Sequence, residues 1–245
     1  MFRVRCPSAR GRSIRSAFSL VELLVVVGVL SVLLGFLLPS LAKTREGVRR
    51  TRSLANLRTL GQCLGIYADV HGGAYPFMDA GQPVSVGCNG TLSTSDYWHV
   101  QTLWPALLQA VVPWDGNVDV FLSPGASRPP ASCGWPSSYL YSHSFVTRPS
   151  LWREGAEADP RLLAPTQIHE LRYPAGKVLL WDSEVPYLLE EPGDHWPYQE
   201  VPLLFADGHA QLRRPADASE PVANPFTGGT TPLHNTRDGV HGRDY

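Results

Sequence analysis

An uninterrupted apolar run near the start of the chain limits what this protein can fold into. Residues 18–38 read FSLVELLVVVGVLSVLLGFLL, 21 residues with one ionisable side chain, Glu22. At about 1.5 Å per residue, a helix of this length crosses the roughly 30 Å hydrocarbon core of a bilayer. A cleavable secretory signal has a shorter apolar core, and a soluble helix that is apolar on all sides needs protein around it. The run therefore predicts a transmembrane helix over residues 18–38.

The charge of the chain is divided between two regions. Residues 1–58 carry 11 Lys and Arg against two acidic residues, whereas residues 59–245 carry 10 against 20. Basic residues flank both ends of the apolar run, so their count does not orient the helix in the membrane. The basic run between Lys43 and Arg58 favours a solvated helix face or lipid headgroups over nucleic acid. Of the 22 prolines, 20 follow residue 75, which predicts a loop-rich body after an N-terminal helical region.

A second apolar pattern follows the predicted membrane helix. Apolar side chains recur at spacings of three or four residues, as on one face of an amphipathic helix, at Leu54, Leu57, Leu60, Leu64 and Tyr67. Gly72 and Gly73 come directly after this pattern, and glycine supplies the left-handed conformation that ends helices. The membrane helix is therefore predicted to continue to about Val70 and to lay this stripe on the body.

Two later segments predict a small antiparallel sheet. Residues 177–182 form an apolar strand that ends in Asp182, and residues 201–206 and 209–212 flank the dipeptide Asp207-Gly208. This dipeptide favours a two-residue type I′ hairpin. The predicted fold class is therefore α+β, with a long N-terminal helix packed on a small antiparallel sheet.

Two further segments carry weaker patterns. Residues 96–112 predict a short helix capped by Asp96, which covers one face of the sheet. Residues 215–245 contain few and scattered apolar side chains, so they are predicted to form a flexible tail.

The polar residues near the strand ends leave two interpretations open. Asp207 and His209 fit turn chemistry and an exposed strand position. The alternative is a small site for a hard cation such as Ca²⁺, formed by Asp182, Asp207 and either His195 or His209. The chain has no Cys-x-x-Cys, nucleophile-elbow, phosphate-loop or metalloprotease pattern. No cofactor and no enzymatic activity are therefore predicted.

The stretch AFSLVE at residues 17–22, after an arginine-rich leader and before the apolar run, resembles the processing signal of type IV prepilins and type II secretion pseudopilins. The resemblance implies cleavage between Ala17 and Phe18 by a membrane peptidase, which then methylates the new amine of Phe18. It also implies that Glu22 neutralises the amine of a neighbouring subunit, and that Pro39 matches the proline of the family's helix. The residue before the cut is usually Gly in this family, and here it is Ala17.

Later motifs resemble the pseudopilin-like proteins of planctomycete and verrucomicrobial bacteria. They are the segments ANLR, YADVHGGAYP, KVLLWD and LLFADGH, in this order along the chain. In that family a His stands some ten positions before the last motif's Asp, whereas His195 stands 12 residues before Asp207. Relatives often carry cysteine at the positions of Ser53 and Ser123.

Removal of the leader would leave three cysteines, Cys63, Cys88 and Cys133. In an extracytoplasmic compartment a disulfide between Cys88 and Cys133 is predicted, with Cys63 packed as a small hydrophobic residue on the helix.

The predicted layout is a leader (1–17), a pilin helix (18–72, transmembrane at 18–38), an α+β body (73–214) and a flexible tail (215–245). The predicted function is that of a pseudopilin-like structural subunit linked to type II secretion or type IV pilus-like systems. It would cross the inner membrane once, with a cytoplasmic leader and a body in the periplasm or at the cell surface. The partners would be a prepilin peptidase, other pilin-like subunits and membrane lipid, with no nucleic acid. The alternative is a monomeric membrane-anchored binding module, with a polysaccharide as the ligand that seven Trp residues would suit.

Overall fold

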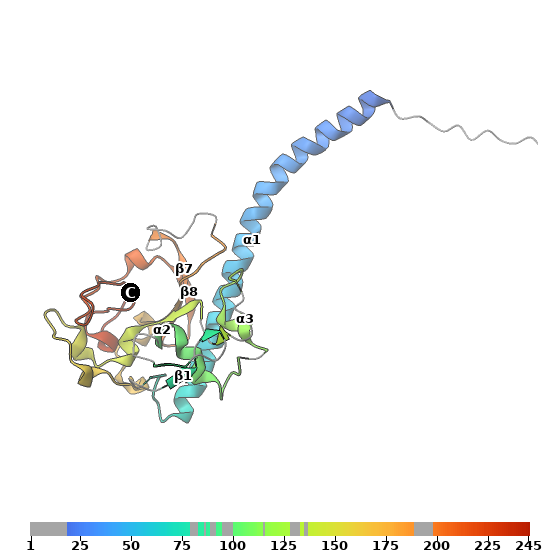
Figure 1. Cartoon of the computed structure of the whole chain (residues 1–245). Helices are drawn as coiled ribbons and strands as arrows, with labels where there is room; N and C mark the ends of the chain where they lie inside the picture. The colour runs from blue at the N-terminus through green and yellow to red at the C-terminus, as the bar shows by residue number, and fades with distance from the viewer. Residues whose placement is uncertain are drawn as a thin grey trace, which may run out of the picture. The chain divides into compact units, whose positions relative to one another are not determined.

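The computed structural model describes residues 19–78, 83–85, 87–88, 92–94, 100–114, 116–127, 133–134, 137–188 and 198–245. The chain divides into two compact units, Met1–Thr44 and Arg45–Tyr245. The first helix, α1 (Leu20–Val70), contributes residues to both units. Figure 1 shows the elements in chain order by colour.

In the second unit, the predicted apolar stripe of α1 is confirmed. Leu57, Leu60, Leu64 and Tyr67 are buried, and Leu54 is partly buried against the same core. The helix ends where the glycines predict, because Gly72 and Gly73 both have positive φ and the amide of Gly73 donates to the carbonyl of Ala68 at 2.7 Å. This bond closes the last turn as in a Schellman motif.

The centre of the second unit is a four-stranded antiparallel sheet, whose order is β5-β6-β7-β8. Its strands are β5 (Tyr139–Tyr141), β6 (Val178–Asp182), β7 (Val201–Phe205) and β8 (Ala210–Arg213). The predicted strand around residues 177–182 and the predicted strand pair of the hairpin are confirmed. The sheet and α1 together give the α+β fold class that the sequence predicts (Figure 1).

The two central strands are buried along their whole length, so both faces of the sheet are covered. On one face, Leu180 and Leu204 share a core with the apolar stripe of α1. The approach is close, because a Cβ added at Gly61 of α1 would lie 3.0 Å from Cδ1 of Leu204. A register shift between Val178 and Leu180 turns Val178 to the opposite face.

The C-terminal segment covers that opposite face, so the prediction of a flexible tail at 215–245 is wrong. Leu233 packs in a second core with Trp181, Leu203 and Phe205. Val222 and Val240 are also buried. The sequence pattern is misleading here because the tail contributes single apolar residues to a large surface that the sheet already presents.

The hairpin differs in detail from its prediction. The amide of Phe205 donates to the carbonyl of His209 at 2.9 Å, and the amide of Gly208 donates to the carbonyl of Phe205 at 2.9 Å. The loop therefore has three residues, Ala206, Asp207 and Gly208, rather than two. Only Gly208 has positive φ, at 89°, which is the geometry of a type I turn with a glycine bulge.

Shorter elements complete the second unit. The prediction of one helix over 96–112 is wrong in its extent. A short α-helix, α2 (Val100–Leu103), is followed directly by the 3-10 helix η1 (Trp104–Leu108). The predicted cap, Asp96, lies outside the described residues. Pro105 lacks the amide that an α-helix would need there. Trp104 is nevertheless buried, with its Nε1 donating to the carbonyl of Tyr139 at 2.9 Å.

The remaining helices and strands are short. Two two-stranded antiparallel sheets are formed by β1 (Pro83–Ser85) with β3 (Leu92–Thr94) and by β2 (Gly87–Cys88) with β4 (Cys133–Gly134). The helices are α3 (Val118–Phe121) and the 3-10 helices η2 (His143–Val146), η3 (Pro149–Trp152), η4 (Pro160–Leu162), η5 (Ile168–Glu170), η6 (Pro174–Gly176), η8 (Pro215–Asp217) and η9 (Gly239–His241).

Candidate functional site

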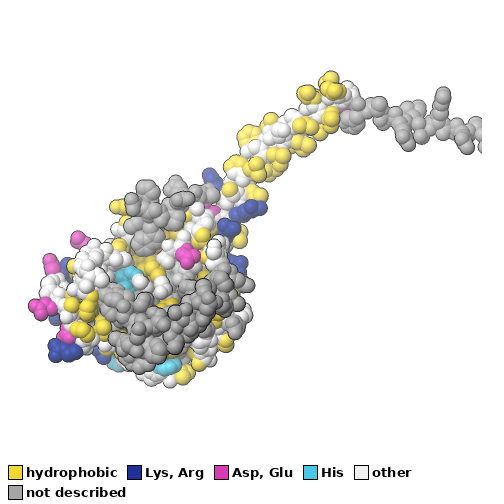
Figure 2. All heavy atoms as spheres, viewed as in Figure 1, with side chains coloured by type: hydrophobic (Ala, Val, Ile, Leu, Met, Phe, Trp, Pro, Cys, Tyr) yellow, Lys and Arg dark blue, Asp and Glu magenta, His cyan; other side chains and the backbone are white. Residues whose placement is uncertain are grey.

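The apolar part of α1 exposes its side chains on every side. Every residue from 20 to 41 is exposed, including all of its Leu, Val and Phe residues. Figure 2 shows the apolar side chains along one face of this segment. In the described part of the chain, α1 is the helix that is long and apolar enough to cross a membrane. Such a surface requires lipid or other apolar helices around it. The protein therefore joins an N-terminal helix with the capacity of a membrane anchor to a small α+β body.

Glu22 lies in the first turn of this apolar helix. Its Oε2 accepts a hydrogen bond from the backbone amide of Ser19 at 2.9 Å. A carboxylate in this place interacts favourably with the positive end of the helix dipole. The predicted processing residues, Ala17 and Phe18, lie outside the described residues. Pro39 lies within α1, whose helical conformation continues on both sides of it.

Asp182 lies at the end of β6 and is completely buried. Its Oδ2 accepts hydrogen bonds from the hydroxyls of Ser53 and Ser123, each at 2.7 Å, and from that of Tyr187 at 2.9 Å. Its Oδ1 accepts the amide of Val185 at 3.1 Å. Burial raises the pKa of Asp182, and these four hydrogen bonds act in the opposite direction.

The donors to Asp182 come from separate parts of the unit. Ser53 belongs to α1, Ser123 follows α3, and Tyr187 follows β6. A buried carboxylate is stable when its lone pairs are satisfied in this way. The arrangement makes Asp182 a structural link between α1 and the sheet, because its oxygens are already engaged by protein donors. The structure brings the hydroxyls of Ser53 and Ser123 to one oxygen atom of Asp182.

Asp207 and His209 lie together at the hairpin. Nδ1 of His209 is 2.5 Å from Oδ1 of Asp207, and the backbone amide of His209 also donates to this oxygen at 3.1 Å. The imidazole stacks on the ring of Phe205 with centroids 4.3 Å apart. These contacts are local to the hairpin and agree with turn chemistry.

The structure does not bring Asp182 and Asp207 together. Trp181 pairs with Leu203, whereas the amide of Ala206 donates to the carbonyl of Lys177 at 2.9 Å. Asp182 and Asp207 therefore lie at opposite ends of the central strand pair, because antiparallel strands place their carboxyl ends apart. Among the described residues, no three His, Cys, Asp or Glu side chains are grouped as metal ligands would be. His195 lies outside the described residues, so its part in a Ca²⁺ site stays a prediction.

Cys88 and Cys133 are direct partners in the antiparallel pair of β2 and β4. Opposite residues in such a pair have Cα atoms about 4.5–5.5 Å apart. A disulfide spans about 4.4–6.8 Å between Cα atoms, so the register permits the predicted bond. Cys63 is buried as a free thiol on α1, and burial raises its pKa.

A second buried polar cluster holds the C-terminal segment. Nζ of Lys177 lies 3.2 Å from Oδ2 of Asp244, and both side chains are buried. Oδ2 also accepts the amide of Val178 at 2.7 Å, and the hydroxyl of Thr236 donates to Oδ1 at 2.5 Å. Burial lowers the pKa of Lys177, whereas Asp244 raises it. No sequence motif predicts this pair, because its partners are far apart in the chain.

Comparison of the chain with protein-family models, with curated proteins and with solved structures finds no match. The class that the fold defines is therefore stated from the structure alone. It is an α+β protein with a long, apolar N-terminal helix and a four-stranded antiparallel sheet, an architecture consistent with that of pilin-like proteins.

Proposed function

We propose that this protein is a pseudopilin-like structural subunit that is anchored in the membrane and assembles through its N-terminal helix. The observation that carries the proposal is the helical segment at residues 20–41, whose apolar side chains are exposed on all sides. Lipid satisfies this surface before assembly, and the same segments of neighbouring subunits satisfy it afterwards. The role is structural rather than enzymatic, in a type II secretion or type IV pilus-like system.

Glu22 supports the assembly step. It is the one ionisable residue of the apolar run, and a carboxylate within a bilayer costs about 2.5–3.5 kcal/mol at the centre and less near the ends. A partner of opposite charge offsets this cost. After cleavage before Phe18, the methylated amine of a neighbouring subunit would be such a partner.

The proposed processing also sets the location. A prepilin peptidase would remove residues 1–17 on the cytoplasmic side, which leaves the body in the periplasm or at the cell surface. The chain would then cross the inner membrane once, and its partners would be lipid and other pilin-like subunits rather than nucleic acid.

Photocrosslinking in the membrane tests this proposal. A photoreactive amino acid at Leu34, an exposed position of the apolar segment, reports contact between neighbouring helices. We expect crosslinked dimers in the parent chain and a several-fold lower yield with Glu22→Ala, whereas membrane insertion is retained because a desolvation cost is removed.

The matched control is Glu46→Ala, which removes a carboxylate from the same helix outside the apolar run, where Glu46 pairs with Arg50 at 2.6 Å. The control should crosslink as the parent chain does. Equal dimer yields in the parent and in Glu22→Ala would contradict the role of Glu22 in assembly, and absence of crosslinked dimers in the parent would favour the monomeric binding module.

A further inference from the structure

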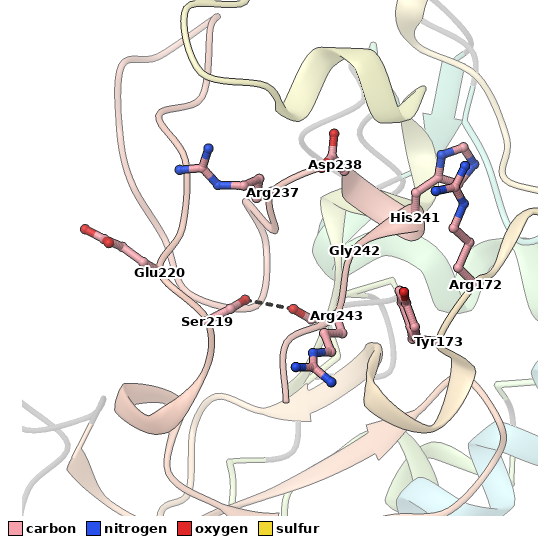
Figure 3. A pocket seen from close by; sticks show the side chains of 9 residues that line it. All are labelled: Arg172, Tyr173, Ser219, Glu220, Arg237, Asp238, His241, Gly242 and Arg243. Carbon is pink, nitrogen blue, oxygen red and sulfur yellow. Dashed lines mark hydrogen bonds between the residues drawn. The ribbon is translucent and has the colours of Figure 1, made fainter.

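A cavity of about 650 Å³ lies at the surface of the second unit. The residues that line it come long after α1 in the chain. Three segments line it: residues 172–173 before β6, residues 219–220 after η8, and residues 237–243 around η9 (Figure 3). The volume is in the range of about 300–1,000 Å³ that is typical of small-molecule sites.

Positive charge is in excess in this cavity. Its lining includes three arginines, Arg172, Arg237 and Arg243, against two carboxylates, Glu220 and Asp238, together with His241. Asp238 is partly engaged elsewhere, because its Oδ1 accepts from Nε of Arg153 at 3.3 Å.

The cationic side chains differ in how far they are already neutralised. Arg237 donates to Oε2 of Glu154 at 3.3 Å. Among the described residues, Arg172 and Arg243 have no carboxylate within ion-pair distance. In Figure 3, the side chains of Arg172 and His241 extend to the same side of the cavity from different segments. Both side chains are exposed, so each guanidinium group is free of ion pairs to described residues and accessible to an external anion. Guanidinium groups bind carboxylate and sulfate through paired hydrogen bonds.

Arg237, His241 and Arg243 lie on one loop, and the backbone of this loop has a fixed conformation. Asp238 has φ 57° and Gly239 has φ 55°. A Cβ at Gly242 would lie 2.0 Å from the carbonyl oxygen of Arg237, so only glycine fits there. The carbonyl of Arg243 accepts the hydroxyl of Ser219 at 2.8 Å. Non-glycine residues with positive φ persist where the surrounding structure holds them, and they occur often at binding sites.

The next residue anchors this loop to the core. Asp244 forms the buried ion pair with Lys177 and accepts the amide of Val178. The positions of the arginine backbones are therefore set by the fold itself. A site that is organised before the ligand arrives loses less entropy on binding.

An aromatic side chain completes the lining. Tyr173 is 52% exposed and lies next to Arg172 in the chain. An exposed aromatic ring beside cationic groups provides an apolar surface for a sugar ring and leaves the anion to the guanidinium groups.

We propose that this cavity binds an acidic saccharide with more than one anionic group. Arg172 and Arg243, whose side chains extend to different sides in Figure 3, would each bind one of these groups, and Tyr173 would be the surface for a sugar ring. This binding activity belongs to the body and does not depend on helix assembly. An inorganic anion shares the chemistry of the charged group but offers nothing to the ring of Tyr173.

Calorimetric titration of the full-length protein in detergent micelles tests the proposal. The probes are trigalacturonate, which carries a carboxylate on each sugar, the uncharged trisaccharide maltotriose, and inorganic sulfate. We expect saturable binding of trigalacturonate, no measurable binding of maltotriose, and sulfate binding at least about tenfold weaker than that of trigalacturonate.

Substitutions assign the binding to this cavity. Arg172→Gln and Arg243→Gln should each weaken trigalacturonate binding by about tenfold or more, because each removes a charge-assisted contact. Tyr173→Ala should weaken trigalacturonate binding and leave sulfate binding unchanged. The matched control is Arg161→Gln, which makes the same change in charge at a side chain that is 90% exposed and outside the cavity. Circular dichroism of each variant confirms that the fold is retained.

Three results would overturn the proposal. The first is absence of trigalacturonate binding at millimolar concentration. The second is equal binding in the cavity variants and in Arg161→Gln. The third is sulfate binding as tight as that of trigalacturonate, which would reduce the site to one for simple anions.

Discussion

Ser53→Ala should destabilise the second unit by about 1–3 kcal/mol, because it removes one donor from a buried carboxylate. Asp182 is fully buried, and the hydroxyl of Ser53 lies 2.7 Å from its Oδ2. The substitution leaves the carboxylate with the bonds from Ser123, Tyr187 and Val185, so the expected loss is that of one charge-assisted bond and not of the whole cluster.

The effect of Ser53→Ala should also depend on pH. Burial raises the pKa of Asp182 in the folded state, so the folded protein retains this proton at pH values at which the unfolded chain releases it. The contribution of Asp182 to stability is thus most favourable below the pKa that this residue has in the unfolded chain. It declines as the pH rises from that value through the pKa of Asp182 in the folded protein. Loss of the Ser53 hydroxyl raises the folded pKa further, which deepens this decline. The destabilisation by Ser53→Ala should therefore be small in acid and grow with rising pH.

Urea unfolding of the full-length protein in detergent, followed by tryptophan fluorescence at several pH values, measures both effects. Trp181 is buried directly before Asp182 and should report the loss of this cluster. Thr59→Ala is the matched control, because Thr59 is exposed on the same helix and its hydroxyl bonds to the carbonyl of Ala55 at 3.1 Å. A loss for Ser53→Ala no larger than that for Thr59→Ala, at every pH, would refute the assignment of Asp182 as the link between helix and sheet.

Four further predictions follow from the second unit. Gly208→Val should cost about 1–3 kcal/mol in urea unfolding because the position has positive φ, whereas Gly208→Asn should cost less. Burial holds the pKa of His234 well below its ordinary value, so stability should fall by up to about 1.4 kcal/mol per pH unit as the pH drops below about 6.5, and the slope should flatten in His234→Gln. Deletion of residues 215–245 should prevent cooperative thermal unfolding, since it uncovers one face of the sheet; an unchanged melting temperature would contradict the packing. Thiol titration of the denatured, non-reduced mature protein should find one free thiol, and three would exclude a disulfide between Cys88 and Cys133.

The local patterns of the sequence predicted most of the elements that position the candidate sites. The spacing of Leu57, Leu60 and Leu64 predicted the packed face of α1, and the two glycines predicted its end. Such features depend on periodicity and on backbone conformation within a few residues, both of which are visible in a single sequence.

The features that depend on distant contacts were not predictable in the same way. Ser53 and Ser123 are 70 positions apart, and only the fold shows that they share Asp182. The buried C-terminal segment also includes the partner of Lys177, Asp244, and no spacing rule connects these two residues. Residues 215–245 are ordered despite their polar composition because they pack on a large apolar face of the sheet.

We propose above all that the chain is processed as a prepilin and serves as a membrane-anchored subunit. The intact mass of the protein, purified from the membranes of a host that has a prepilin peptidase, is the sharpest test of this proposal. We expect the loss of residues 1–17 and the gain of one methyl group at Phe18. A mass that corresponds to all 245 residues without a cut, or to cleavage at another position, would refute the proposal.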